Sequence, residues 1–381
     1  MEPVSVKNMK VDDVMSNEYV SICEDDSLGD ALGKMKETNI YELMVLKSGS
    51  KDIISGVLTY DVVMMRKKLS METKVGNIMS PAPKISEVDS IVDVSEKLLA
   101  VESKTLPVTK KDRIVGVVSR RDIILAAAAS MEIGGVDVQE IMTPEPRTVL
   151  ETDKMLKAMH IMRELDEHFV PVVSKDEKVI GVVGSREMVS LHTPSKRETR
   201  GDRSGDSKPP EIMVSSIMIP PVTIGPGLSV ANAVDVMHKK NVPSVLIEED
   251  GKLLGVLTES DVVELVLSTR DQEGVFVQIS GLDHVDPDVY DGIYEMVGKY
   301  MRKVANFYQP QTLMIHSSQH NTTGGEAKYS VHMRLNTNKR MFFTKSSEWD
   351  IYIAVDKALE DMEKIARREK DKLKKSTRML R

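Results

Sequence analysis

A segment of about 60 residues recurs four times within the first 270 residues, and this repetition constrains the fold more than any other feature. Each repeat opens with an apolar residue, two variable residues and a hydrophobic-Met pair, at 11–15, 75–79, 138–142 and 214–218. A Gly followed by two apolar residues comes later in each, at 56–58, 116–118, 181–183 and 255–257. Units this small bury little apolar surface alone, so we expect them to pack in pairs.

The pattern inside a repeat alternates between helical and strand periodicity. In repeat 2, Ile91, Val94 and Leu98 fall on one helical face, and two short apolar strands follow around Val108 and Val117. Each repeat is therefore predicted to be a small mixed α/β unit. The interval between repeats 3 and 4 is lengthened by a polar stretch at 192–210, which has the composition of a disordered loop.

These repeated signatures resemble the CBS domain, which usually occurs as tandem pairs called Bateman modules. The resemblance implies two modules, a first CBS pair over 1–130 and a second over 131–270. It covers nearly all of the chain before residue 270.

The junction between the second strand of a repeat and the following helix carries the candidate binding chemistry. A hydroxyl at a helix N-terminus can donate to a phosphate, and a carboxylate three residues later can accept from ribose hydroxyls. By resemblance to CBS domains this pattern is an adenine-nucleotide signature that takes AMP, ADP or ATP as a regulatory ligand. The candidate nucleotide-binding residues are Ser119, Arg120, Arg121 and Asp122 in repeat 2, and Thr258 and Asp261 in repeat 4.

The same pattern is also an ordinary helix N-cap, so a purely structural role remains an alternative at both junctions. Repeat 1 has Thr59 and Asp61, a spacing one residue short of the signature. Repeat 3 reads Gly184-Ser185-Arg186-Glu187, which lacks the hydroxyl at the signature position and lengthens the acid. Repeat 1 also has Glu42 where the other repeats have proline. We therefore expect a degenerate site in repeat 3 and an incomplete ribose contact in repeat 1.

The sequence contains no recognisable catalytic constellation, and we expect neither an enzyme nor a bound metal. The eight histidines are scattered without metal-ligand spacing, and Cys23 is the single cysteine. No apolar run is long enough to span a membrane, and no signal-peptide pattern opens the chain. The prediction is a cytoplasmic protein that makes no membrane contact.

The net charge of −7 conceals two kinds of domain. Residues 271–381 hold 18 basic and 16 acidic residues, so the first 270 residues carry a net charge of −9. Of the 15 aromatic residues, 11 lie after residue 270. The two parts are therefore interpreted separately, with a third domain over 275–381.

Periodicity in 275–381 predicts the element order β-α-β-β-β-α, one sheet backed by two helices. We expect Ser347 to cap the final helix. Its core stripe is predicted to be Ile351, Tyr352, Val355, Leu359, Met362 and Ala366. From Lys364 onward, the sequence has nine basic residues and only two acidic ones. That excess is larger than the helix dipole alone favours and indicates a polyanionic partner, although a solvated helix end is the alternative.

The element order, the run 347–359 and the basic tail resemble the ribosome hibernation-promoting family, also called sigma-54 modulation proteins. That family sits on the small ribosomal subunit and blocks translation. The resemblance implies contacts to rRNA phosphates, which position a protein without reading sequence. The candidate RNA-binding residues are Lys299, Arg302, Lys303, Arg334, Lys339, Arg340, Lys357, Lys364, Arg367, Arg368, Lys370 and Lys372.

Together these resemblances imply a ribosome hibernation factor whose CBS modules sense adenine nucleotides. As a homodimer it would carry two ribosome-binding domains and bridge two small subunits or ribosomes. One alternative is an adenylate-sensing regulatory subunit of another enzyme such as a kinase, with 275–381 contacting a protein. Another is a general RNA-binding regulator.

Overall fold

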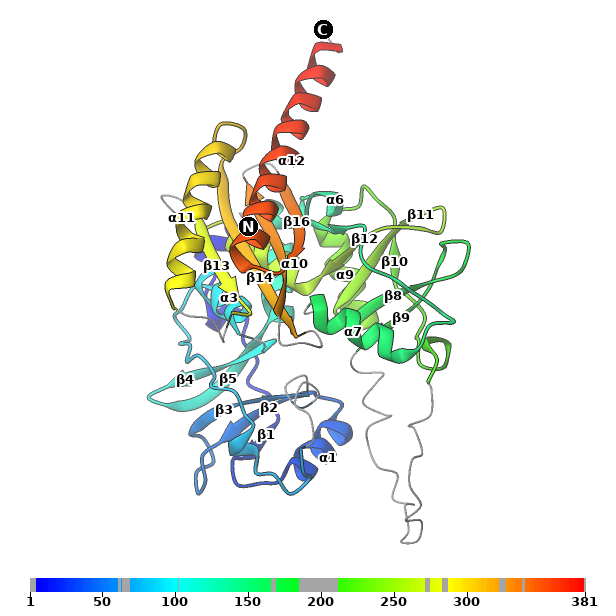
Figure 1. Ribbon diagram of the computed structural model, residues 1–381. Helices are drawn as coiled ribbons and strands as arrows, with labels where there is room; N and C mark the ends of the chain where they lie inside the picture. The colour runs from blue at the N-terminus through cyan, green and yellow to red at the C-terminus, as the bar shows by residue number, and fades with distance from the viewer. Residues whose placement is uncertain are drawn as a thin grey trace. The chain divides into compact units, whose positions relative to one another are not determined.

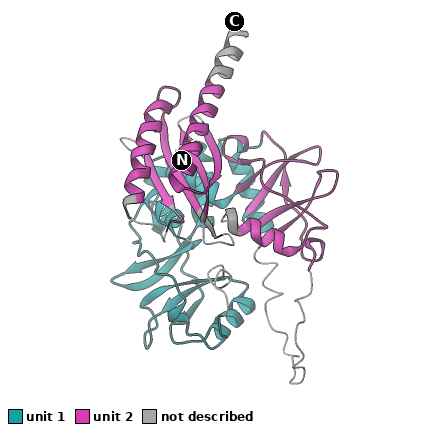
Figure 2. Cartoon of the chain, in the orientation of Figure 1, with its two compact units in different colours: residues 1–138, 228–243, 258–271 teal, residues 139–227, 244–257, 272–381 magenta. Residues whose placement is uncertain are grey.

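The computed structural model describes residues 5–60, 63, 69–101, 103–165, 169–184, 212–270, 275–282, 287–321, 327–337 and 340–379 (Figure 1). The polar stretch 192–210 lies outside them. The chain divides into two compact units (Figure 2). The first comprises 1–138, 228–243 and 258–271, and the second comprises 139–227, 244–257 and 272–381.

The first unit holds repeats 1 and 2 and the two helices of repeat 4. Its elements are β1 (Ser21–Cys23), α1 (Leu28–Thr38), β2 (Glu42–Leu46), β3 (Ile54–Thr59), α3 (Ile91–Ala100), β4 (Thr105–Lys110), β5 (Arg113–Ser119), α4 (Arg120–Ala128), α5 (Met131–Gly134), α9 (Val230–Lys240) and α10 (Glu259–Leu267). The strands form the sheets β1-β2-β3 and β4-β5. The helix predicted after β5 is present and begins at Arg120.

Repeats 1 and 2 pair through their strands. Single β-bridges join Ser16 to Val117 and Val57 to Ser80. A buried cluster that includes Met44, Val57 and Val117 fills the space between the two sheets. Burial of apolar surface contributes about 25 cal/mol per Å², so this cluster stabilises the pairing of two repeats that are too small to form a sizeable core alone.

The second unit holds repeat 3, the strands of repeat 4 and the C-terminal domain. The elements from the two repeats are α6 (Val138–Ile141, whose first residue belongs to the first unit), β6 (Thr143–Pro144), β7 (Val149–Leu150), α7 (Met155–Leu165), β8 (Phe169–Val173), β9 (Val179–Gly184), β10 (Thr223–Ile224), β11 (Ser244–Glu249) and β12 (Lys252–Thr258, whose last residue belongs to the first unit). β7-β8-β9 is one sheet and β10-β11-β12-β6 another. Bridges from Lys178 to Lys252 and from Val182 to Ile219 pair repeat 3 with repeat 4. The described repeats thus form two Bateman modules, as the sequence predicts.

The C-terminal domain has the predicted order: β13 (Phe276–Ser280), α11 (Pro287–Val304), β14 (Pro310–Asn321), β15 (Ala327–Thr337), β16 (Met341–Glu348) and α12 (Ile351–Met379). The sheet order is β13-β14-β15-β16, with β13 parallel to β14 and the other pairs antiparallel. After β13 the chain turns at Gly281, whose φ of +78° and contact with the Ser317 carbonyl leave no room for a Cβ. Figure 1 shows α11 and α12 beside this sheet.

One core joins the sheet to both helices. Ile293, Val297, Met301 and Val304 of α11 are buried in it. On α12 the stripe from Ile351 to Ala366 is buried, with one exception. Tyr352 is 36% exposed, so its assignment to the core was wrong.

The predicted cap of α12 is corrected too. β16 continues to Glu348, and Ser347 lies within it, its Oγ 3.2 Å from Ser330 Oγ. The Asp350 carboxylate instead accepts from the Ile353 N–H at 3.0 Å. The strand extends past the serine because its ladder to β15 reaches Tyr329 opposite Glu348.

Candidate nucleotide-binding junctions and nucleic-acid interface

In repeat 2, Ser119 ends β5 and caps α4. Its Oγ accepts from the Asp122 N–H at 3.2 Å and donates to the Asp122 carboxylate at 2.6 Å. The same carboxylate accepts from the Ser119 N–H at 2.8 Å. This is a complete capping box, and both side chains remain half-buried, so the signature residues are within reach of a ligand.

Repeat 4 has the same local arrangement. Thr258 caps α10, and the Asp261 carboxylate accepts from the Thr258 N–H at 2.6 Å and Oγ1 at 2.9 Å. Asp261 differs from its counterpart because its exposed fraction is 0%. The sequence pattern is met at both junctions, but a ligand has access only to the carboxylate of repeat 2 in this conformation.

The two arginines of repeat 2 join its junction to that of repeat 4. Arg120 is 9% exposed and donates to Ser260 Oγ at 2.7 Å and to the Leu98 carbonyl at 3.0 Å. Arg121 Nε lies 3.0 Å from Glu259 Oε1, and its Nη1 donates to the Asn241 side chain. The predicted phosphate ligands are therefore engaged by repeat 4.

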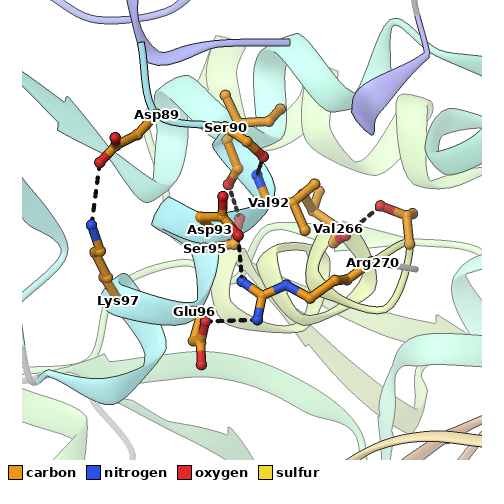
Figure 3. Close-up of polar contacts among 11 residues, drawn as sticks. Asp89, Ser90, Val92, Asp93, Ser95, Glu96, Lys97, Val266 and Arg270 are labelled. Atoms are coloured by element: carbon orange, nitrogen blue, oxygen red, sulfur yellow. Dashed lines mark hydrogen bonds and ion pairs between the residues drawn. The ribbon is translucent and has the colours of Figure 1, made fainter. Parts of the chain in front are cut away.

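A second contact fastens the other end of α10 to repeat 2. Arg270, which follows α10, forms ion pairs with Asp93 and Glu96 of α3, both at 2.7 Å (Figure 3). Its side chain is only 20% exposed. Helix α10 is thus tied to repeat 2 at both ends by arginine–carboxylate contacts.

A small, partly open pocket lies between repeats 1 and 2, and the sequence pattern did not single it out. Thr59 of repeat 1 and Ser103 and Leu106 of repeat 2 are among its walls. Glu42 of repeat 1 accepts from the Lys104 N–H at 2.8 Å and from Ser103 Oγ at 3.5 Å. Burial raises the pKa of the Glu42 carboxyl. The available sequence signal was Glu42 itself, at the position that is proline in the other repeats.

Some candidate residues of repeats 1 and 3 cannot be placed. Asp61, Ser185 and Glu187 lie outside the described residues. Within the described ranges, no helix is both long and apolar enough to cross a membrane.

The candidate RNA-binding cations gather mostly on α11 and α12. Lys299, Arg302 and Lys303 of α11 are exposed, as are Lys357, Lys364, Arg367 and Arg368 of α12. Lys370 and Arg340 are half-buried. Lys339 and the side chain of Lys372 lie outside the described part of the chain.

Several of these cations already have carboxylate partners. Glu363 binds Arg367 at 2.7 Å and Lys303 at 3.2 Å, which links the two helices. The other ion pairs of these cations are Lys364 with Glu360 and Asp361, Arg340 with Glu369, and Lys357 with Glu348. Among the described residues, Lys299, Arg302 and Arg368 have no ion pair. The i,i+4 spacing of Glu360–Lys364 and of Glu363–Arg367 is readable in the sequence and lowers the unpaired positive charge that a count of basic residues indicates.

Aromatic rings lie among these cations. Arg367 and Lys370 lie 5.4 and 5.3 Å from the ring centre of Phe307. Lys303 lies 4.5 Å from the ring of Tyr300, whose hydroxyl donates to Asp356 at 3.0 Å. Burial and Asp356 raise the pKa of Tyr300 to about 12, so it stays a neutral donor at physiological pH. Arg334 stacks 4.9 Å from Phe343 and donates to Thr143 Oγ1, so it faces away from the helical cations.

Comparison with known proteins agrees with this arrangement. The CBS domain family matches residues 11–66, 75–129, 138–192 and 214–268, together more than half of the chain. The chain belongs to the CBS domain family. The C-terminal domain of hibernation factor Hib matches residues 276–380 of this CBS protein. The matched domains are regulatory or binding modules rather than catalytic ones.

Two curated relatives of this CBS protein are archaeal. The protein MJ1404 of Methanocaldococcus jannaschii is 24% identical over 78% of this chain and 70% of its own length. A 33.4 kDa protein in the ribosomal RNA operon of Thermofilum pendens is 28% identical over 60% of this chain and 77% of its own length.

A solved structure shares the fold. Protein MJ1225 of Methanocaldococcus jannaschii, described as a candidate archaeal homologue of g-AMPK, aligns with a TM-score of 0.55 at 17% identity. The alignment covers 67% of this chain and 99% of MJ1225.

Proposed function

We propose that this CBS protein binds the rRNA of the small ribosomal subunit through its C-terminal domain and senses adenine nucleotides through its CBS repeats. The observation that carries the proposal is the match of 276–380 to the Hib C-terminal domain, in which outward-facing cations line α11 and α12. The relative in the ribosomal RNA operon of Thermofilum pendens supports the ribosomal connection.

The paired and unpaired cations make different contributions to this interface. An exposed ion pair contributes only about 0–1 kcal/mol, so a phosphate can replace its carboxylate at small cost. Within the described part of the chain, Lys299, Arg302 and Arg368 have no carboxylate to displace. We therefore expect these three to contribute most to binding per residue.

The test is sedimentation of the full chain with purified small subunits over a salt series. Replacing Lys299, Arg302 and Arg368 together with alanine should weaken binding and flatten the plot of log affinity against log salt by about 2 to 3 units. A matched control replaces Lys34, Lys36 and Lys240, three exposed lysines of the CBS repeats. Failure to sediment with small subunits at low salt would contradict the proposal, and equal effects of the two triple variants would contradict the assigned face.

The sensing part is tested by calorimetric titration of AMP, ADP and ATP against the full chain. Repeating the sedimentation with each bound nucleotide would show whether it promotes or releases ribosome contact. Binding of none of the three would contradict the sensor role without affecting the ribosomal one.

A homodimer that bridges two small subunits remains part of the proposal. Light scattering of the free chain gives its oligomeric state, and electron microscopy of the sedimented particles shows whether subunits are paired. A monomer bound to single subunits would contradict bridging alone.

A second candidate function is favoured by the fold shared with MJ1225. In this alternative the CBS repeats regulate another enzyme, and the C-terminal domain contacts a protein. Because that interface would not release counterions from RNA, its affinity would show a nearly flat salt dependence.

A further inference from the structure

Trp349 is the chain's single tryptophan, and 54% of it is exposed. It stands between β16 and α12, and both of its neighbours are fixed. Glu348 is paired with Tyr329 in the β15–β16 ladder, and Asp350 accepts from the Ile353 N–H. The next residue, Ile351, is anchored in the core at 6% exposure. The backbone that carries the exposed indole is therefore fixed on both sides.

The first turn of α12 carries two further exposed side chains. Tyr352 is 36% exposed and its ring packs against Gly292 of α11, and Ile353 is 52% exposed. The neighbour of the indole is instead Lys328, so we give the name indole platform to Trp349 alone. An exposed aromatic side chain on a fixed backbone is a common feature of binding sites.

The charges around the platform favour an anionic partner. The Lys328 ammonium lies 5.8 Å from the centre of the indole ring. Lys345 on β16 is exposed. Of the two nearby carboxylates, Glu348 is paired with Lys357, and Asp350 accepts from the Ile353 N–H, so Lys328, Lys345 and Lys357 outnumber the acids by one. A ligand that places negative charge beside an aromatic face therefore fits this surface.

We propose that Trp349 is a stacking platform for an unpaired RNA base, with Lys328 contacting the adjoining phosphate. This inference rests on the proposed binding of rRNA and adds a contact of a different kind from the phosphate contacts of α11 and α12. Unpaired bases stack on aromatic side chains, and tryptophan offers the largest ring. Lys328 approaches the ring from one side and a base stacks on the other.

The platform can be observed directly because indole fluorescence from the full chain reports on Trp349 alone. Excitation at the red edge, where tyrosine does not absorb, should show quenching when purified small subunits are added, measured as the difference from Trp349→Phe at the same subunit concentration because the subunits carry tryptophans of their own. Single-stranded oligoadenylate is a second probe, which tests stacking even if the chain does not bind ribosomes. A blue shift without quenching would mean that a protein surface covers the indole, and it would overturn the proposal.

Substitution separates stacking from charge. Trp349→Ala should weaken small-subunit binding about 5- to 100-fold and leave the salt slope unchanged, whereas Trp349→Phe should retain most of the affinity. Lys328→Ala should instead reduce the salt slope by about 0.7. The matched control is Tyr294→Ala, which removes another exposed aromatic, 46% exposed, from α11.

The outcomes distinguish this inference from the function on which it rests. If the chain sediments with small subunits but Trp349→Ala behaves as Tyr294→Ala does, the stacking platform is wrong and the ribosomal proposal stands. If sedimentation fails and oligoadenylate leaves the fluorescence unchanged, both are wrong. Urea midpoints of the variants confirm that each remains folded.

Discussion

The junctions of repeats 2 and 4 have the same capping box but different surroundings. In both, a hydroxyl at the helix N-terminus and a carboxylate three residues later bond to each other and to the backbone. Asp122 is half-buried, whereas Asp261 has no exposed surface. The local motif therefore determines where the helix begins, but it does not determine whether the capping carboxylate is accessible to a ligand.

The surroundings explain the difference. Helix α10 packs on both α3 and α4 and carries two more largely buried acids, Glu259 and Glu264. Arg121 is the recorded partner of Glu259. Repeat 4 thus supplies Glu259 and Ser260, which bind Arg121 and Arg120 of repeat 2, while its own Asp261 is buried.

Stability should respond most at repeat 4. Asp261→Ala removes a fully buried carboxylate, leaves the Thr258 N–H without its acceptor and should lower the free energy of unfolding by about 2–3 kcal/mol. Asp122→Ala should cost about 1 kcal/mol, because water can reach its half-buried site. Urea midpoints from circular dichroism compare the two variants. Equal midpoints would show that the burial of Asp261 has no energetic consequence.

Nucleotide affinity should respond in the opposite order. Asp122→Ala removes a charged acceptor that ribose hydroxyls can reach and should weaken calorimetric binding about 10- to 100-fold. Asp261→Ala should change it much less, measured at a temperature where the variant is folded. Asp122→Asn serves as the conservative control. A larger loss from Asp261→Ala would mean that the ligand opens the repeat 4 junction.

The contact between the junctions should show measurable coupling. Arg121→Ala leaves Glu259, 9% exposed, without that partner, whereas Arg121→Ala with Glu259→Gln removes both charges. A double-mutant cycle should give a coupling energy of about 1 kcal/mol in urea unfolding. A coupling energy of zero would mean that the two junctions are energetically independent.

The smallest effect is expected at the far end of α10. Arg270→Gln breaks two ion pairs whose carboxylates are 58% and 34% exposed, so the cost should be about 0.5 kcal/mol and should shrink at high salt. Thermal melting at low and high salt measures it. A loss that is independent of salt would indicate that Arg270 acts through packing.

The sequence predicted the elements better than it predicted their surfaces. Four repeats and the order β-α-β-β-β-α follow from periodicity, which depends on neighbours along the chain. The assignment of Tyr352 to the core was wrong. It lies next to the buried Ile351 at the edge of the helical stripe, where periodicity cannot distinguish a partly covered ring from a buried one. The prediction that Ser347 caps α12 was wrong because the β15–β16 pairing continues through Ser347.

The candidate site was predictable only as a motif. Ser119 and Asp122 were found from their spacing, but the partners of Arg120 and Arg121 come from repeat 4, some 140 residues later, as in the Arg120–Ser260 hydrogen bond. No local pattern reports such a contact. The domain boundaries near residues 130 and 270 stay predictions, since the helices and strands of repeat 4 fall in different compact units.

The length of α12 has a consequence for the size of any ligand. Its 29 residues span about 44 Å, roughly a dozen base pairs of duplex. The indole platform lies just before the first turn of α12. The basic run begins at Lys364 and continues to the C-terminal end of the helix. A short oligonucleotide can therefore occupy only one end at a time. A large folded RNA can occupy both ends. Once it is bound at one end, the second contact forms at high effective concentration. The helix should therefore bind large RNAs more tightly than short ones.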